Sequence, residues 1–385
     1  MTTMAIDNKD KKVLNVPHLR FPEFSGEWKK HSLGEIGETI IGLTYKPSDV
    51  VDNNGIIVFR SSNIKNGMID YSDLVRVNKH IKDKIITKEN DILVCARNGS
   101  QRLIGKNAII KQEDANNTFG AFMMVYRAND NPFILPLLST KKYFSQVGEN
   151  LGARINQITT SDFNGFEFYF PENHAERTKI AELFRLLDER IATQNKIIEK
   201  LQSLIKGIRN NMMIQNQGDY IALQDIADIY QPKTILSTDL TEDGYLVYGA
   251  NGIIGKYHLY NHEKEQICIT CRGNTCGTVN YTEPKSWITG NAMVINTDNF
   301  AENVNKRYLF HYLSSINFNS IISGSGQPQI VRQPLAKLKI ILPELTIQEH
   351  IAKCLDTILA KIKNEQTSLQ AIQIQKSYLL SQMFI

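Results

Sequence analysis

Short stretches of this chain approach catalytic motifs, but each lacks a residue that its chemistry requires. Residues 131–133 read Asn-Pro-Phe, whereas the tetrad with which adenine methyltransferases hold their base needs a second proline. Gly99 and Gly105 are separated by five residues rather than the four of a phosphate-binding loop, and Asn107 stands where that loop needs a hydroxyl. We interpret the first stretch as a helix start and the second as turns between strands.

Three cysteines, Cys268, Cys271 and Cys276, lie close enough in sequence to raise the question of a metal site. A structural zinc ion needs four ligands, and no local fourth cysteine or Cys-x-x-His pattern is present. On a strand, Cys268 and Cys271 would also point to opposite faces of the sheet. No serine–histidine–aspartate set or nuclease carboxylate cluster can be assigned either. We therefore expect no metal, no catalytic residue and no cofactor bound by this chain itself.

Composition narrows the class of protein. The chain has 385 residues, enough for two domains, and its 42% hydrophobic and 22% charged content is that of a soluble globular protein. It has no apolar run of membrane-spanning length and 5 cysteines, which we expect to be reduced thiols in a cytoplasm. The net charge of +4 is modest, so a nucleic-acid partner would need local basic clusters or help from other subunits.

The clearest pattern in the chain is an apolar seam that occurs twice. From Ile180 onward, apolar residues recur at alternating steps of three and four, the heptad spacing of a coiled coil. The seam begins again at Ile351, 171 positions later. Gln194 interrupts the first copy, and Glu365 and Lys376 interrupt the second; such polar residues can fix register. Spacing leaves open whether the two helices pair with each other or with another protein. The predicted seam consists of Ile180, Phe184, Leu187, Ile191, Ile198, Leu201, Ile205, Ile208, Ile351, Leu355, Ile358, Ile362, Leu369, Ile372 and Leu379.

The segments around the seams repeat as well. Residues 152–171 align with 324–343, residues 92–99 with 267–274, and residues 118–125 with 288–295, which places Gly120 on Gly290. The period is too long for a solenoid and indicates duplication of a whole domain with its helix. Each helix also starts after a proline with a capping-box pattern, at 173–176 in the first copy and 346–349 in the second.

The globular halves alternate short β-branched runs with turns rich in Gly, Asn, Asp and Ser. Helical patterns occur at 132–147 and 306–322. The predicted fold class is therefore α+β: two mixed α/β domains in tandem pseudo-repeat, with two long helices. The expected order is a first domain at 1–171, a central helix at 172–215, a second domain at 216–343 and a C-terminal helix at 344–385.

This organisation resembles the specificity (S) subunit of type I restriction–modification systems over essentially the whole chain. Residues 19–38 (LRFPEFSGEWKKHSLGEIGE) look like the usual entry into the first target-recognition domain. Residues 247–261 followed by 267–279 look like the core of a common type of second domain. Residues 323–330 (SGSGQPQI), followed by Leu-Pro and a helix, look like the junction between a strand and the spacer.

The resemblance implies a DNA specificity subunit that is not catalytic by itself. In the family, each target-recognition domain reads one half of a split, asymmetric site in double-stranded DNA. Two long helices, packed as an antiparallel coiled coil, set the gap and dock two methyltransferase (M) subunits, and restriction–translocase (R) subunits join for cleavage. S-adenosylmethionine, ATP and Mg would then act through the partner subunits, in the bacterial cytoplasm and nucleoid. A helix over 176–214 would span roughly 55–60 Å, more than one DNA turn of ~34 Å.

Under this reading, the residues that contact DNA should lie in turns. Arg suits guanine, Asn and Gln suit adenine, and Lys and hydroxyls suit phosphates. The matched pairs Arg97/Arg272 and Gln157/Gln329 are the preferred candidates, although both Gln positions could instead hold the junction or touch phosphate; solvated turns are the general alternative. The candidates are Arg60, Ser62, Asn63, Lys65, Arg97, Asn98, Gln101, Arg102, Lys106, Arg154, Asn156, Gln157, Tyr248, Asn251, Lys256, Arg272, Asn274, Thr275, Gln327, Gln329 and Arg332.

Two other functions compete with this one. A fused restriction–methylation enzyme would need methyltransferase and nuclease motifs, which the sequence lacks. A coiled-coil scaffold without DNA binding would not explain two duplicated domains with loops rich in Arg, Asn and Gln.

Overall fold

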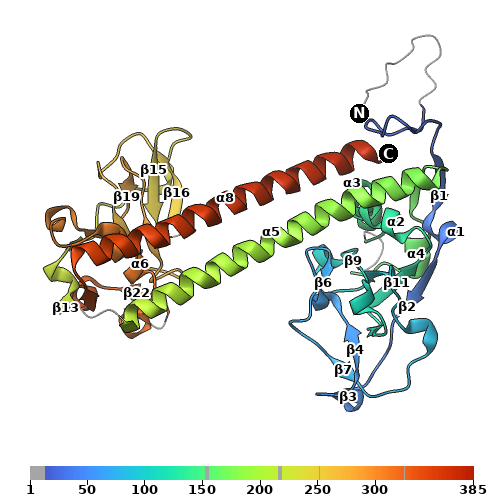
Figure 1. Ribbon diagram of the computed structural model, residues 1–385, viewed down its shortest axis with the longest axis horizontal. Coiled ribbons are helices and arrows are strands. Elements are labelled where there is room, and N and C mark those ends of the chain that lie inside the picture. The colour runs from blue at the N-terminus through green and yellow to red at the C-terminus, as the bar shows by residue number, and fades with distance from the viewer. Residues whose placement is uncertain (1–13, 152–155, 216–218, 251, 325) are drawn as a thin grey trace, which may run out of the picture. The chain divides into compact units, whose positions relative to one another are not determined.

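The computed structural model describes residues 14–151, 156–215, 219–250, 252–324 and 326–385 (Figure 1). It forms two compact units: Met1–Thr193 together with Leu369–Ile385, and Gln194–Ser368. We call their globular parts the first and the second domain. Within the described residues, no helix combines the length and the hydropathy needed to span a bilayer.

The first domain is built on a four-stranded antiparallel sheet in the order β2-β11-β8-β9 (Glu38–Ile41, Met123–Arg127, Ile92–Cys95, Asn107–Ile109). Strand β8 is apolar throughout because both faces of the sheet are covered. Ile92 and Val94 pack into one core cluster, whereas Leu93 and Cys95 pack into another. Helices α2 (Asn131–Leu137), α3 (Lys141–Leu151) and α4 (Thr160–Asn164) contribute to the first cluster. The second cluster lies against a small sheet, β10-β4-β7-β3 (Thr118–Phe119, Ile56–Phe59, Arg76–Val77, Val50–Val51).

The second domain repeats this topology. Its antiparallel sheet has the order β14-β20-β17-β18 (Asp228–Tyr230, Ala292–Asn296, Ile267–Thr270, Val279–Tyr281). A small sheet, β16-β15-β19 (Gly252–Tyr257, Tyr245–Gly249, Trp287–Ile288), contains a parallel pair that corresponds to β4–β10. Helix α6 (Lys306–Leu313) packs beside β18, where the rings of Phe310 and Tyr281 lie 5.4 Å apart. The duplication read from the sequence is therefore a duplication of sheet order.

The strand register corrects one detail of the repeat. Cys95 and Thr270 occupy the same place in β8 and β17, and they pair with Met123 and Ala292. Met123 therefore corresponds to Ala292, one residue before the partner that the aligned glycines imply. Gly120 was matched to Gly290 because both are glycines, but main-chain pairing determines the structural equivalence.

A two-stranded antiparallel sheet leads from each domain into its helix. Strand β1 (Lys29–Ser32) pairs with β12 (Glu167–Phe170), and β13 (Asp219–Ala222) pairs with β23 (Lys339–Leu342). The remaining short elements are α1 (Leu33–Ile36), α7 (Arg332–Ala336), β5 (Ile64–Lys65), β6 (Met68–Ile69), β21 (Ile322–Ser323) and β22 (Gln329–Ile330).

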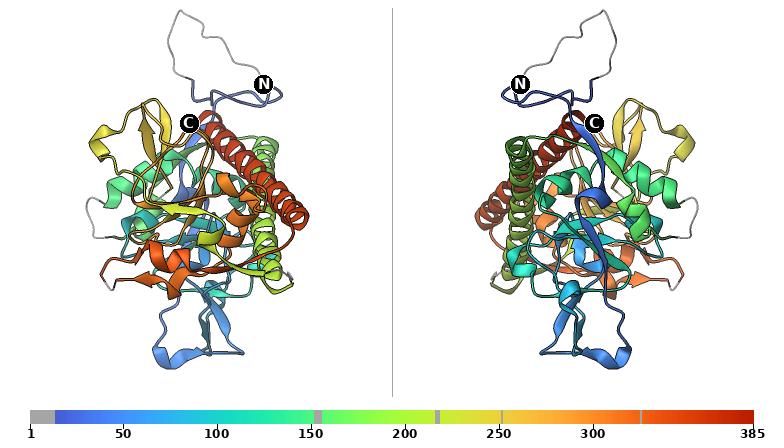
Figure 2. Two further views of the ribbon diagram at one scale, coloured as in Figure 1. Left: turned by 90° about the vertical axis from the view of Figure 1, so that its left-hand side faces the viewer. Right: turned by 90° about the vertical axis from the view of Figure 1, so that its right-hand side faces the viewer.

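The long helices α5 (His174–Gln215) and α8 (Leu345–Met383) lie side by side (Figures 1 and 2). In the first unit, Phe184 packs with Phe384, and Asp188 forms an ion pair with Lys376. As the residue number increases along α5, the number of the contacting residue on α8 decreases. The two helices are therefore antiparallel. All of the predicted seam side chains are buried or half-buried. The sequence left open whether the two helices pack against each other or against another protein. The structure shows that they pack against each other.

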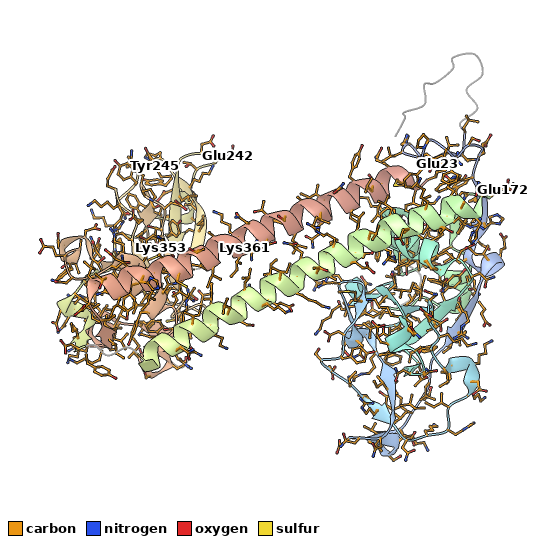
Figure 3. The ribbon with its side chains drawn as sticks, in the orientation of Figure 1. Glu23, Glu172, Glu242, Tyr245, Lys353 and Lys361 are labelled. Carbon is orange, nitrogen blue, oxygen red and sulfur yellow. The ribbon has the colours of Figure 1, made fainter. Side chains whose placement is uncertain are left out.

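The seam interruptions of the second unit form a polar contact. Gln194 is only 3% exposed, and its Nε2 donates to the main-chain oxygen of Glu365 at 3.1 Å and also to its carboxylate. Lys361, on α8 in Figure 3, pairs with the same carboxylate at 2.6 Å. The buried amide therefore has its partner on the facing helix, as a residue that fixes register requires.

Neither predicted capping box closes, although Asn173 does cap α5, because its Oδ1 accepts from Ala175 N at 2.9 Å. Helix α8 already begins at Leu345, so Thr346 lies inside it, and Glu349 is exposed. In α5, the carboxylate of Glu176 does not bond to the helix terminus but accepts from Arg20 and Trp28. Gln348 takes the comparable buried place in α8, where it bonds to the main chain of residues 303, 305 and 343. The polar side chains of Glu176 and Gln348 therefore bind the first turn of each helix to its own domain.

Candidate nucleic-acid interface

In the first domain, the fold places Arg97 beside Gln157. Strand β8 ends at Cys95, and the chain beyond it is held by the segment that precedes α4. Ile158 N donates to Ala96 O at 2.9 Å, and Asn98 N donates to Asn156 O at 3.3 Å. Arg97 and Gln157 thus face each other in a short antiparallel bridge.

The second domain builds the same bridge from Arg272 and Gln329. Here Ile330 N donates to Cys271 O at 3.0 Å, and Gly273 N donates to Pro328 O at 3.0 Å. We call the two pairs, Arg97–Gln157 and Arg272–Gln329, the Arg–Gln bridges. The main chain makes the bridge in both cases, so the bridge itself uses none of the four side chains.

The side chains of the bridges suit base recognition. Arg97, Arg272 and Gln329 are exposed, and Gln157 is half-buried. A guanidinium can donate two hydrogen bonds to guanine O6 and N7, and an amide can pair with adenine N6 and N7. A rigid pair of these two groups could therefore distinguish bases in the major groove.

The surroundings of the two bridges differ, and they contain residues that the sequence did not single out. The guanidinium of Arg97 lies 5.1 Å from the ring centre of Phe122, a side chain that is 59% exposed. The second bridge borders an open hollow of about 410 Å³, which is lined by Ala250, Arg272, Gly273, Asn291, Gln327 and Gln329. Phe122 and Asn291 lie at strand starts and carried no sequence signal for a site.

Two of the candidates are structural residues, because they have almost no exposed surface. Asn63 is 0% exposed; its Oδ1 accepts from Arg60 N at 2.9 Å, and its Nδ2 donates to Asp73 O at 2.8 Å. Tyr248 is 5% exposed, and its hydroxyl accepts from Glu283 N at 3.1 Å. Both stabilise turns from inside, and neither can meet a base in this conformation.

Four charged candidates already have a protein partner. Arg60 pairs with Asp73 at 2.9 Å, and Lys65 pairs with Asp70 at 2.9 Å. Lys256 lies 3.7 Å from Asp243. Arg332, which is exposed, donates from Nε to the main-chain oxygen of residue 229 at 2.7 Å. These contacts hold the side chains, and the carboxylates beside Arg60, Lys65 and Lys256 also reduce the net positive charge near them.

The other candidates fall into two groups. The exposed ones are Ser62, Gln101, Arg102, Asn274 and Gln327, and the half-buried ones are Asn98, Lys106, Asn156 and Thr275. Asn98 donates to Ser61 at 2.9 Å and Asn156 to Gly99 O at 3.1 Å, so these two amides shape the loop beside the first bridge. Arg154 and Asn251 lie outside the described residues.

Two of the cysteines, Cys95 and Cys268, are buried thiols. Burial raises the pKa of the Cys95 thiol to about 11 and that of Cys268 to about 12, so both stay protonated. In the part of the chain that the structure describes, no group of three or more His, Cys, Asp or Glu residues could hold a metal ion. Among the candidates, the Arg–Gln bridges remain the preferred ones, because both domains build them in the same way.

Comparison with known families agrees with a DNA-recognition role. The family model of the type I restriction–modification DNA specificity domain matches residues 25–203 and again residues 219–373. The chain therefore belongs to the type I restriction–modification specificity family and carries its domain twice. It is the DNA specificity subunit of such a system, a subunit that is not itself catalytic.

Individual relatives are distant. The chain is 22% identical to the type I restriction enzyme EcoprrI specificity subunit of Escherichia coli, over 79% of this chain and 80% of that one. It is 29% identical to the putative specificity subunit S.HindORF215P of Haemophilus influenzae, but the match spans only 38% of each chain. The crystal structure of the S subunit from M. genitalium superimposes with a TM-score of 0.69 and 18% identity, covering 96% of this chain and 99% of that one. This similarity confirms the predicted fold.

Proposed function

We propose that each domain reads one half of a split, asymmetric site in double-stranded DNA, and that its Arg–Gln bridge lies at the base edges. The observation that carries this proposal is the repetition of one main-chain frame in both domains with different side chains around it. A repeated frame suits two half-sites, and different surroundings suit two different sequences.

The paired helices would set the gap between the half-sites and dock two M subunits. Large apolar side chains remain exposed along them: Leu186 and Leu204 singly on α5, and Ile374 (70%) and Tyr378 (60%) as i,i+4 neighbours on one face of α8. Exposed apolar surface of this kind supports an interface with another protein. R subunits would join the assembly for cleavage. S-adenosylmethionine, ATP and Mg would be bound by the partner subunits, in the cytoplasm.

The test is to co-express the chain with its cognate M subunit and to map methylated adenines across the genome. A split motif that depends on this chain is expected. Arg97→Ala should relax or change only one half of the motif, and Arg272→Ala only the other half. Loss of one bidentate base contact costs about 1–3 kcal/mol of discrimination.

Lys84→Ala serves as the control for lost charge. Lys84 is 65% exposed and pairs with Glu38 at the opposite end of the first sheet, so the motif should not change. If no methylation depends on the chain, the proposal is refuted. If Arg97→Ala and Arg272→Ala both leave the motif intact, the bridges are not the reading elements.

A further inference from the structure

We propose that Phe122 and Asn291 are the residues that make the two domains read different bases, Phe122 by contact with a thymine methyl group and Asn291 by hydrogen bonds to adenine. This inference rests on the proposed function and adds two recognition residues to it. It starts from a structural equivalence that the sequence does not reveal.

The main chain places Phe122 and Asn291 identically beside the two bridges. Phe122 O accepts from Ala96 N at 3.0 Å, and Asn291 O accepts from Cys271 N, the equivalent donor, at 3.0 Å. Each residue directly precedes the first paired residue of its strand, Met123 or Ala292. The two side chains therefore leave the same position of the repeated frame.

Phe122 is exposed although the strand that follows it is buried. The ring is 59% exposed, whereas Met123 and Met124 are each 1% exposed. Arg97 lies over the ring, which restricts the guanidinium and lowers the entropy it would lose on binding. An exposed phenyl ring beside a base-reading arginine is suited to the C5-methyl group of thymine, the apolar feature of the major groove.

Asn291 offers a different chemistry at the equivalent place. Its main-chain oxygen is committed to Cys271, and its side chain lines the hollow together with Arg272, Gln327 and Gln329. Among the residues that the structure describes, the amide of Asn291 makes no hydrogen bond. A carboxamide with both groups available can donate to adenine N7 and accept from adenine N6.

The experiment measures how tightly the complex of this chain with M subunits binds DNA duplexes that carry the mapped motif. Modified and unmodified duplexes compete for binding. In the half-site altered by Arg97→Ala, each thymine is replaced in turn by deoxyuridine, which lacks only the methyl group. Wild-type complex should lose about fourfold in affinity at one of these positions. Phe122→Ala should bind both duplexes equally.

In the other half-site, each adenine is replaced by 7-deazaadenine, which lacks the N7 acceptor. Wild-type complex should lose about five- to tenfold at one position, and Asn291→Ala should be insensitive to the replacement there. Each variant is the control for the other, because Phe122→Ala should keep the adenine effect and Asn291→Ala the thymine effect. Phe144→Ala, which removes another exposed aromatic ring of the first domain, should keep both.

The inference is overturned for Phe122 if that half-site contains no thymine, or if Phe122→Ala still distinguishes thymine from deoxyuridine as wild type does. It is overturned for Asn291 by the corresponding result with 7-deazaadenine. A complex that binds no split motif at all would instead refute the proposed function. The two failures are therefore distinguishable.

Discussion

The buried ion pair at the start of α5 gives a prediction whose magnitude follows from the structure. The side chain of Glu176 is 1% exposed, and that of Arg20 is 13% exposed. Arg20 donates from Nε and Nη2 to the two carboxylate oxygens at 2.7 and 2.8 Å, and Trp28 Nε1 adds a third contact at 3.3 Å. Arg20 also donates to the main-chain oxygens of Ser25 and Gly26, so it ties the entry segment of the first domain to the helix.

Arg20→Met removes the cation but keeps most of the side-chain volume. It leaves a carboxylate that is buried and without its counter-charge, and breaking such a pair costs about 3–5 kcal/mol. The control is Lys29→Met. Lys29 pairs with Glu172, at the N-terminal side of α5 in Figure 3, and both side chains are more than 60% exposed. An exposed pair contributes about 0–1 kcal/mol, so the control should lose little stability.

A second substitution separates lost charge from lost packing. Adding Glu176→Gln to Arg20→Met should recover about 1–3 kcal/mol, because a neutral amide costs less to bury than a carboxylate. The second unit shows that an amide is tolerated at this kind of position, since Gln348 is 0% exposed and fully hydrogen-bonded.

The assay is urea unfolding followed by tryptophan fluorescence. The chain has 2 tryptophans, so a Trp287→Phe background leaves Trp28, which touches Glu176, as the reporter of the first unit. The reasoning is refuted if Arg20→Met costs no more than Lys29→Met, or if Glu176→Gln recovers nothing in the Arg20→Met background.

Three further predictions concern the second unit. Burial, with Arg209 donating to Nδ1, lowers the pKa of His311 from 6.5 to about 4, so the unfolded chain takes up this proton first as the pH falls. Unfolding free energy should therefore fall by about 2–3 kcal/mol between pH 7 and 4.5, and His311→Gln should abolish most of that slope in denaturant titrations; an equal slope in the variant would contradict the assignment. Tyr248→Phe should cost about 1 kcal/mol in the same assay and leave the methylation motif unchanged, whereas a changed motif would return Tyr248 to a reading role. Gln194→Leu removes the contact with Glu365, and the methylome should then contain sites with more than one gap length; a single unchanged gap would count against register control by this residue.

The sequence was most informative where a pattern repeats over many residues. The seams that start at Ile180 and Ile351 predicted two long helices, and the apolar run 92–95 indicated a strand, which is β8. Such patterns are redundant, because each apolar position supports the same periodicity. The correspondence of Arg97 with Arg272 could be predicted in the same way, because both residues follow a strand pattern that is repeated in the two domains.

Single residues were predicted less well, because their roles depend on contacts with distant segments. The spacing of Glu176 fitted a capping box, yet a half-buried arginine 156 positions away in sequence takes its carboxylate. Asn63 and Tyr248 have the residue types of a recognition loop, but their polar groups bond to main-chain atoms inside the protein. Residue type shows which hydrogen bonds a side chain can make, and only the fold shows which of them are already made.

Phe122 and Asn291 illustrate the opposite error. Both residues open an apolar run that reads as a strand, and the first residue of such a run gives no sign of a binding role. Aligned by their glycines, the repeats also place these two residues out of register, so their equivalence is hidden. Strand pairing restores it through Met123 and Ala292. If a duplicated frame is to read two different half-sites, the side chains that differ at equivalent positions must carry the difference, and register identifies those positions where sequence similarity does not.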